Sequence, residues 1–164
     1  MLIATNGKST EVDYFDGLKQ EPWVRSRVVV VLERGSPVDL VRGAARRRQR
    51  DDFDEAWAVC DVDHYLTTPA TREAVAADVK LAWSNPCFEV WLLLHYENCT
   101  RYVENAKKAR DLLRKHDPDW DKTALNFDRF RNRIEDALRR ADRLDPPPKS
   151  NPSTSVGQII AALR

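Results

Sequence analysis

The sequence lacks three features that would place it at once in a broad class of protein: a net charge, a long apolar run and paired cysteines. Its 27 Lys and Arg residues nearly balance its 26 Asp and Glu residues, so no overall basic field indicates a nucleic acid partner. The longest apolar segment, VWLLLHY, is too short to span a membrane, and no signal peptide is evident after Met1. Three cysteines without a CxxC pair argue against a disulfide framework or a zinc site. We therefore expect a soluble, cytoplasmic protein.

Basic residues are nevertheless concentrated in two runs, each within a segment of helical character. The arginines of these runs are Arg42, Arg46, Arg47, Arg48 and Arg50 in the first and Arg129, Arg131 and Arg133 in the second. They fit either two solvated helix faces or a local patch that contacts the backbone of DNA or RNA without base specificity.

Up to residue 100, short apolar segments alternate with segments of helical periodicity. Strands are expected at residues 2–5, 27–33, 55–63 and 80–84, and helices after Gly7 and at residues 37–50, 67–79 and 85–97. The strand at 27–33 is apolar on both faces and is therefore expected to be buried on both sides. Asn85 is expected as the N-cap of the last of these helices, with Pro86 at its first position. The alternation predicts an α/β fold with a roughly four-stranded, mostly parallel sheet and helices on both faces.

The remaining part of the chain is expected to be a helical extension, residues 101–164, with helices at 102–115, 124–143 and 154–164. A Pro-rich connector, residues 145–155, precedes the last helix. That helix is too short to form a domain by itself, so we expect a single domain, residues 1–164, with the extension packed on it.

Two acids end the third expected strand, after its apolar part WAVC. Asp61 and Asp63 are two residues apart, which places both carboxylates on the same side of an extended chain, and ligands of a parallel sheet bind outside the carboxyl ends of its strands. A hard divalent cation, Mg²⁺ or Mn²⁺, would relieve their mutual repulsion. The alternative is that they cap the next helix or form salt bridges. Their place after the third strand disfavours a haloacid-dehalogenase-type phosphatase, and the chain is short for a nucleotide-sugar transferase.

The chain has one further candidate acid and three histidines. Glu89 is the one acid in the first turns of an otherwise apolar helix, and it fits either a functional role or a structural hydrogen bond. His64 adjoins the two acids and fits metal binding, phosphate contact, proton relay or a plain surface position. His95 is expected in the core, and His116 at a helix end.

Four segments together resemble the RloB-like family of prokaryotic defence proteins. They are NGKSTEVDYFDGLK, FDEAWAVCDVDHY, SNPCFEVWLLLHYE and NPSTSVGQII, and they occur in this order along nearly the whole chain. The resemblance implies a TOPRIM-like domain and Mg²⁺-dependent cleavage of phosphodiester bonds, with a Glu after the first strand and a DxD motif after the third. It also implies an ABC-type or AAA-like ATPase partner in an anti-phage or restriction-associated system.

Asp61 and Asp63 match the metal-binding DxD of the family, but the first motif departs from its pattern. Gly7, Thr10 and Glu11 match that motif, whereas Asn6 stands where the family has Glu. An amide cannot carry the proton or the charge, and loss of such a group costs a factor of ~10²–10⁴ in rate. Glu11, which the helix dipole also favours in a first turn, and Glu89 are the candidate substitutes.

Candidate substrate contacts are Asn6, Gly7, Lys8, Thr10, Asn85, Lys149, Asn151 and Thr154. Lys8 and the glycine turn of NGKST suit a phosphate, while the polar residues of PKSNPST fit either a segment that closes over the site or a capped surface loop. Two principal functions remain open: a Mg²⁺-dependent nuclease, or a catalytically weakened TOPRIM-like subunit that binds metal or nucleic acid beside an ATPase. A nucleotidyl-transfer activity on the same metal site is a third.

Overall fold

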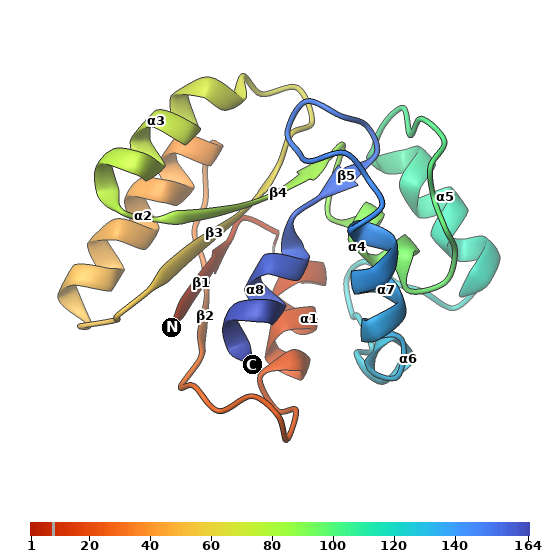
Figure 1. Ribbon diagram of the computed structural model, residues 1–164, viewed down its shortest axis with the longest axis horizontal. Helices are drawn as coiled ribbons and strands as arrows, with labels where there is room; N and C mark the ends of the chain where they lie inside the picture. Colours follow the sequence, from red (N-terminus) through yellow and green to blue (C-terminus); the bar gives the residue numbers. More distant parts are fainter. Residues whose placement is uncertain (8) are drawn as a thin grey trace.

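The computed structural model describes residues 1–7 and 9–164 and contains a five-stranded sheet (Figure 1). The strand order is β2-β1-β3-β4-β5, with β1 at Leu2–Thr5, β2 at Val29–Leu32, β3 at Ala56–Asp61, β4 at Lys80–Asn85 and β5 at Ser153–Thr154. The first four strands pair in parallel, and β5 is antiparallel to β4. The predicted α/β fold is confirmed, and its sheet is consistent with a TOPRIM-like arrangement.

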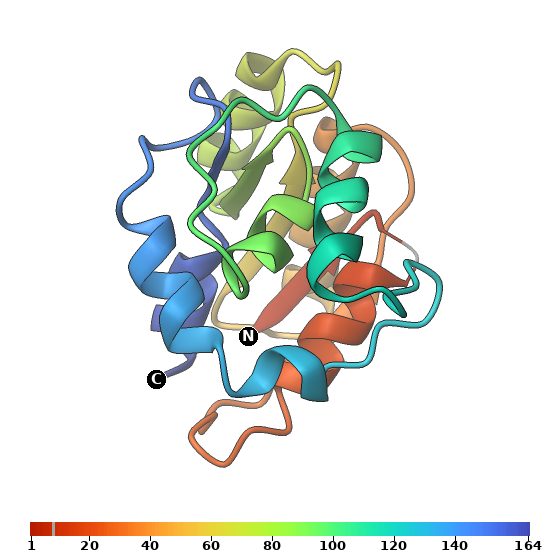
Figure 2. The same cartoon turned by 90° about the vertical axis from the view of Figure 1, so that its right-hand side faces the viewer.

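Helices lie on both faces of the sheet. Their bounds are α1 Thr10–Leu18, α2 Pro37–Arg50, α3 Thr67–Ala77, α4 Glu89–Leu94, α5 Ala106–His116, α6 Asp128–Arg131, α7 Ile134–Ala141 and α8 Val156–Leu163. Helices α2 and α3 cover one face, and α1, α4 and α8 lie on the other (Figure 1). Figure 2 shows α5 running beside α4, outside the layer that contacts the sheet. Within the described residues, no helix is both long and apolar enough to cross a membrane.

Side chains of successive strand residues enter two separate cores, because neighbouring residues of a strand point to opposite faces. Ile3 and Val59 belong to the larger core, with α1 and α4, while Leu2 and Ala58 belong to the smaller core under α2 and α3. The larger core also contains side chains from the helical extension, among them Phe130. The extension therefore shares its hydrophobic core with the sheet.

Local signals in the sequence explain the start of α2. The Ser36 side chain accepts a hydrogen bond from the Asp39 backbone N–H, and the Asp39 carboxylate accepts one from the Ser36 backbone N–H. This reciprocal pair is a capping box, and Pro37 occupies the first helical position, where its missing N–H has no cost.

Two expectations for the first half of the chain need correction. Strand β2 packs against a core on both faces, as expected, but all four of its residues are only partly buried, because it lies at the border of the sheet with β1 as its neighbour. Asn85 is not a helix N-cap but the last residue of β4, because it pairs with Ser153 in the ladder to β5. Helix α4 consequently begins only at Glu89.

The connector, residues 145–155, returns to the main body as expected, and it also contributes β5 to the sheet. Two expectations for the helices of the extension need correction. The helix expected at 102–115 begins at Ala106, because the Asn105 side chain caps it by accepting a hydrogen bond from the Lys108 backbone N–H at 2.9 Å. The helix expected at 124–143 is divided into α6 and α7 by non-helical backbone at Asn132 and Arg133.

Candidate functional site

The carboxyl edge of the sheet carries polar side chains on the face that holds the larger core. Thr5, Asp61 and Ser84 end or nearly end β1, β3 and β4, and they have the same strand parity as the core residues Ile3, Val59 and Ala82. Helix α1 begins just after β1 and α4 just after β4, on this same face. Side chains from both helix starts are therefore brought towards Asp61.

Glu11 is one of these side chains and lies at the second position of α1. It is 7% exposed, and its carboxylate folds back against Gly7. A Cβ atom at Gly7 would overlap the Glu11 carboxylate, so any other residue at this position requires the flexible Glu11 side chain to move.

Glu89 is the second side chain that a helix start brings towards Asp61. It lies at the first position of α4 and is 8% exposed. Its Oε1 lies 3.4 Å from Nη1 of Arg110, a cation on α5. Partly buried Asp61 stands beside the same helix start, where its Oδ1 accepts a hydrogen bond from the Phe88 backbone N–H at 2.9 Å. Asp61 therefore also organises the turn that leads into α4.

The charges of these three carboxylates act on one another. Burial raises the pKa of Glu11 from 4.5 to about 7, and the nearby charge of Glu89 adds to the effect. Burial also raises the pKa of Asp61 well above its ordinary value, and the charges of Glu11 and Glu89 raise it further. Carboxylates from three different elements thus share a poorly solvated space in which a proton or a cation is favoured. We call Glu11, Asp61 and Glu89 the acidic cluster.

Asp63 and His64 are more exposed than the three carboxylates of this cluster, and the charge of Asp63 also raises the pKa of Asp61. The strand ends at Asp61, and Asp63 has a positive φ of 38° in a turn, so the extended geometry expected for the two aspartates is wrong. The Asp63 backbone N–H donates to the carbonyl oxygen of Pro86 at 3.0 Å, which fixes the turn. The Asp63 carboxylate is exposed and lies 2.9 Å from Nδ1 of His64. Asp63 and His64 therefore border the cluster on its solvent side.

The acidic cluster has the oxygen ligands that a divalent cation prefers, but its side chains are not arranged around one common point. Carboxylate oxygens are the ligands that Mg²⁺ and Mn²⁺ prefer. In residues 1–7 and 9–164, however, no group of three or more His, Cys, Asp or Glu side chains is positioned to hold a metal ion. Binding would therefore require a change of rotamer, which the unbranched side chains of Glu11 and Glu89 allow.

The sequence matches a known protein family over nearly its whole length. A family model described as RloB-like protein matches residues 1–163. The chain belongs to the RloB-like family. No curated protein and no solved structure matches it significantly.

In this RloB-like chain, three of the predicted substrate contacts, Asn85, Asn151 and Thr154, have structural partners. The Asn151 side chain accepts from the Val103 backbone N–H at 2.9 Å and donates to the Val103 carbonyl at 2.8 Å. Thr154 and Ser84 share a hydroxyl hydrogen bond of 2.9 Å, and Asn85 donates to the Pro148 carbonyl at 2.8 Å. The segment before α8 is thus fixed to β4 and is not a free flap.

The other predicted contacts are less constrained. Thr10 donates its hydroxyl hydrogen to the carbonyl oxygen of Lys122 at 2.9 Å, which ties the start of α1 to the extension. Asn6 is half-buried in the bend after β1, and Lys149 is exposed. Lys8 lies outside the described residues.

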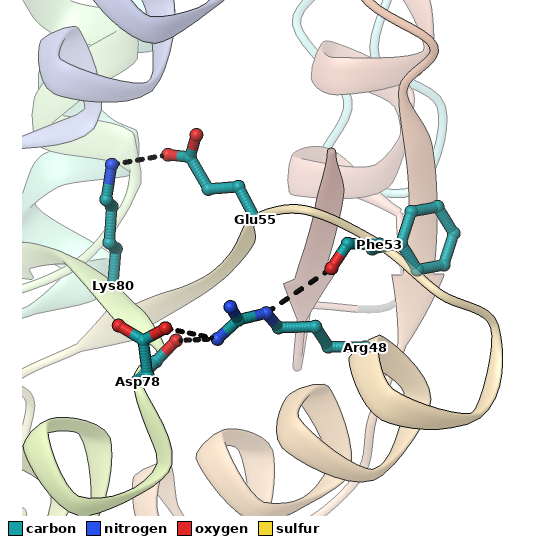
Figure 3. Close-up of polar contacts among 5 residues, drawn as sticks. All are labelled: Arg48, Phe53, Glu55, Asp78 and Lys80. Atoms are coloured by element: carbon teal, nitrogen blue, oxygen red, sulfur yellow. Dashed lines mark hydrogen bonds and ion pairs between the residues drawn. The ribbon is translucent and has the colours of Figure 1, made fainter.

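The two arginine runs are largely neutralised in this RloB-like protein. Six of the eight arginines form ion pairs with acids, namely Arg42, Arg47, Arg48, Arg50, Arg129 and Arg131. Arg48 binds the Phe53 carbonyl and Asp78 at the amino edge of the sheet, next to the Lys80–Glu55 pair (Figure 3). This is the edge opposite to the acidic cluster, so Arg48 cannot assist a ligand bound there.

Two neighbours of the cluster were not anticipated from the sequence. Arg110 reaches Glu89 only because α5 packs on α4, and no local pattern signals that contact. Cys87 is buried, and burial followed by the charges of Glu89 and Asp61 raises the pKa of its thiol.

Both remaining histidine predictions are confirmed. His95 is fully buried, with ring nitrogens 3.0 Å from the Trp91 carbonyl and 3.2 Å from the Tyr14 hydroxyl. His116 ends α5 and lies 3.0 Å from Glu97.

Proposed function

We propose that this RloB-like protein cleaves phosphodiester bonds in DNA or RNA with the help of a divalent cation, Mg²⁺ or Mn²⁺. The observation that carries the proposal is the acidic cluster: the charges of three carboxylates from three elements act on one another near the carboxyl edge of the sheet, and burial with mutual repulsion raises the pKa of two of them. The oxygens that would hold the cation belong to Asp61, Glu11 and Glu89.

A bound cation would neutralise this charge and polarise a phosphate oxygen. Glu11 has a pKa of about 7, which is the range in which a carboxyl group both accepts and releases a proton near neutral pH. Without a cation Glu11 therefore holds a proton near neutral pH, and a bound cation would replace that proton. Arg110 holds Glu89 from the protein side, and exposed Asp63 and His64 border the path by which a nucleic acid strand approaches.

The test is cleavage of single- and double-stranded DNA and RNA in Mg²⁺ or Mn²⁺. Asp61→Asn and Glu11→Gln are isosteric, neutral replacements, and each is expected to reduce the rate by about 10²-fold or more. Glu104→Gln is the matched control, because it removes an exposed carboxylate in the loop before α5 and is expected to leave the rate unchanged. Cleavage that persists in Asp61→Asn would show that the acidic cluster is not the active site.

A second proposal is a catalytically weakened subunit that binds metal or nucleic acid beside an ABC-type or AAA-like ATPase of an anti-phage system. It is favoured by Asn6 at the place of the family Glu and by the lack, within the described residues, of a preformed group of metal ligands. Asn6→Glu separates the two proposals. Cleavage by Asn6→Glu alone indicates a disabled nuclease, whereas cleavage by the natural chain, lost in Glu11→Gln, supports the first proposal.

A further inference from the structure

Strand β2 presents an unusually apolar border to the sheet. Its residues Val29–Leu32 continue an apolar run, RVVVVLE. In the described residues β2 pairs with β1, Val30 packs against the larger core and Val29 and Val31 against the smaller one, yet all four residues of the strand remain partly exposed. Natural proteins usually protect such a border with charges, proline or a bulge.

The free hydrogen-bonding groups of this border follow from the pairing with β1. The Val29 backbone N–H donates to the Met1 carbonyl, and the Glu33 N–H donates to the Thr5 carbonyl. Residues of odd number therefore face β1, and because backbone groups alternate along a strand, those of Val30 and its even-numbered neighbours point away from the sheet. Val30 lies at the centre of this outward-facing set.

The sequence of the border is complementary to itself. Antiparallel pairing of RVVVVLE with a second copy about Val30 places Val30 opposite Val30, in a hydrogen-bonded pair that uses the outward groups. The same register places Arg27 opposite Glu33 of the second copy, at both ends of the paired segment. Arg27 is exposed and has no ion pair among the described residues, and Glu33 binds Arg47 through Oε1 only. The register and the charges thus agree.

We propose that two copies of this chain associate through antiparallel pairing of their β2 strands to form one continuous sheet with two-fold symmetry. The interaction uses the outer border of each β2 once, so the assembly closes as a dimer and does not extend into a fibre. The opposite border, β5, is only two residues long and offers little for further pairing. Since the strands of the two copies run in opposite directions, their acidic clusters lie at opposite edges of the joined sheet and act as separate sites.

The test is the mass of the full chain in solution, by analytical ultracentrifugation over a range of concentrations. The natural chain is expected to show twice the mass of one copy. Val30→Pro removes an outward N–H that has no partner among the described residues, at a position where an edge strand tolerates proline, and it is expected to give monomers. Arg27→Glu places like charges opposite each other and is expected to raise the dissociation constant of the dimer by about tenfold or more.

Two controls make the register itself testable. Arg25→Glu changes the same charge in the exposed loop before the strand and is expected to leave the dimer intact. Glu33→Lys alone is expected to give monomers, and a mixture of Arg27→Glu with Glu33→Lys chains is expected to restore dimers, because unlike charges then face each other at both ends. Circular dichroism checks that each variant is folded. If Val30→Pro does not fold, Arg27→Glu, Glu33→Lys and their mixture test the proposal. A monomeric natural chain, or a dimer that survives Arg27→Glu and Glu33→Lys, would overturn the proposal.

Discussion

Replacing Glu11 with Gln isolates the electrostatic cost of the acidic cluster. The pKa of Glu11 rises from 4.5 to about 7 in the folded protein, chiefly because the carboxyl group is buried. A carboxyl group whose pKa is raised in this way favours folding below its unfolded pKa, and that contribution is lost as the pH rises through the folded value. Free energy of unfolding should therefore fall between about pH 4.5 and pH 7.

The size of this effect follows from the shift. Each pKa unit corresponds to 1.36 kcal/mol, so the wild type carries a penalty of about 3 kcal/mol above pH 7 that a neutral glutamine does not. Removing the Glu11 charge also lowers the pKa of Asp61, so part of the gain in the free energy of unfolding comes from Asp61. We expect Glu11→Gln to be more stable than the wild type by about 2–3 kcal/mol near pH 8, and nearly equal to it near pH 4.5.

Urea denaturation of both proteins across this pH range, with and without Mg²⁺, measures the difference directly. The cation is expected to stabilise the wild type most at the alkaline end, where it replaces the missing proton, and to stabilise Glu11→Gln much less. Equal pH slopes for the two proteins would refute the reasoning, because they would mean that Glu11 is solvated in the folded state.

Three further changes test other parts of the structure. Gly7→Ala should displace the Glu11 carboxylate and flatten the same pH profile, and a stability curve unchanged from the wild type would contradict the steric argument. Burial lowers the pKa of His95 from 6.5 to about 4, so stability should fall as the pH drops from about 6.5 towards 4, by about 3 kcal/mol in total, and His95→Gln should lose that acid sensitivity in urea titrations. Asn151→Ala leaves the Val103 backbone groups without their partner and should lower the free energy of unfolding by about 1–3 kcal/mol, whereas Lys149→Ala nearby should change it little.

The order of strands and helices in the first half of the chain could be predicted because its signals are local. Apolar runs such as AWAVC and the capping residues around Pro37 depend on neighbours in the sequence, so the alternation and the α/β class follow from them. Two members of the acidic cluster, Asp61 and Glu89, could be placed at the carboxyl edge by the same reasoning, since Asp61 lies at the end of one predicted strand and Glu89 follows another.

The long-range contacts could not be predicted in this way. Asn85 was expected as a helix cap because Asn-Pro is a common helix start, yet pairing with Ser153, far along the chain, makes it a strand residue. The position of β2 at the border of the sheet is likewise a matter of strand order, which four successive valines do not encode.

The amino-acid sequence alone determined the class of fold, the family resemblance and the acids at the strand ends, because periodicity and short motifs are properties of neighbouring residues. Tertiary structure decided which acids meet. The chain leaves its extended course at Asp61, so Asp63 turns to solvent, while the starts of α1 and α4 bring Glu11 and Glu89 to Asp61. Burial then raises the pKa of Glu11 and Asp61, a consequence of desolvation that no spacing in the sequence expresses.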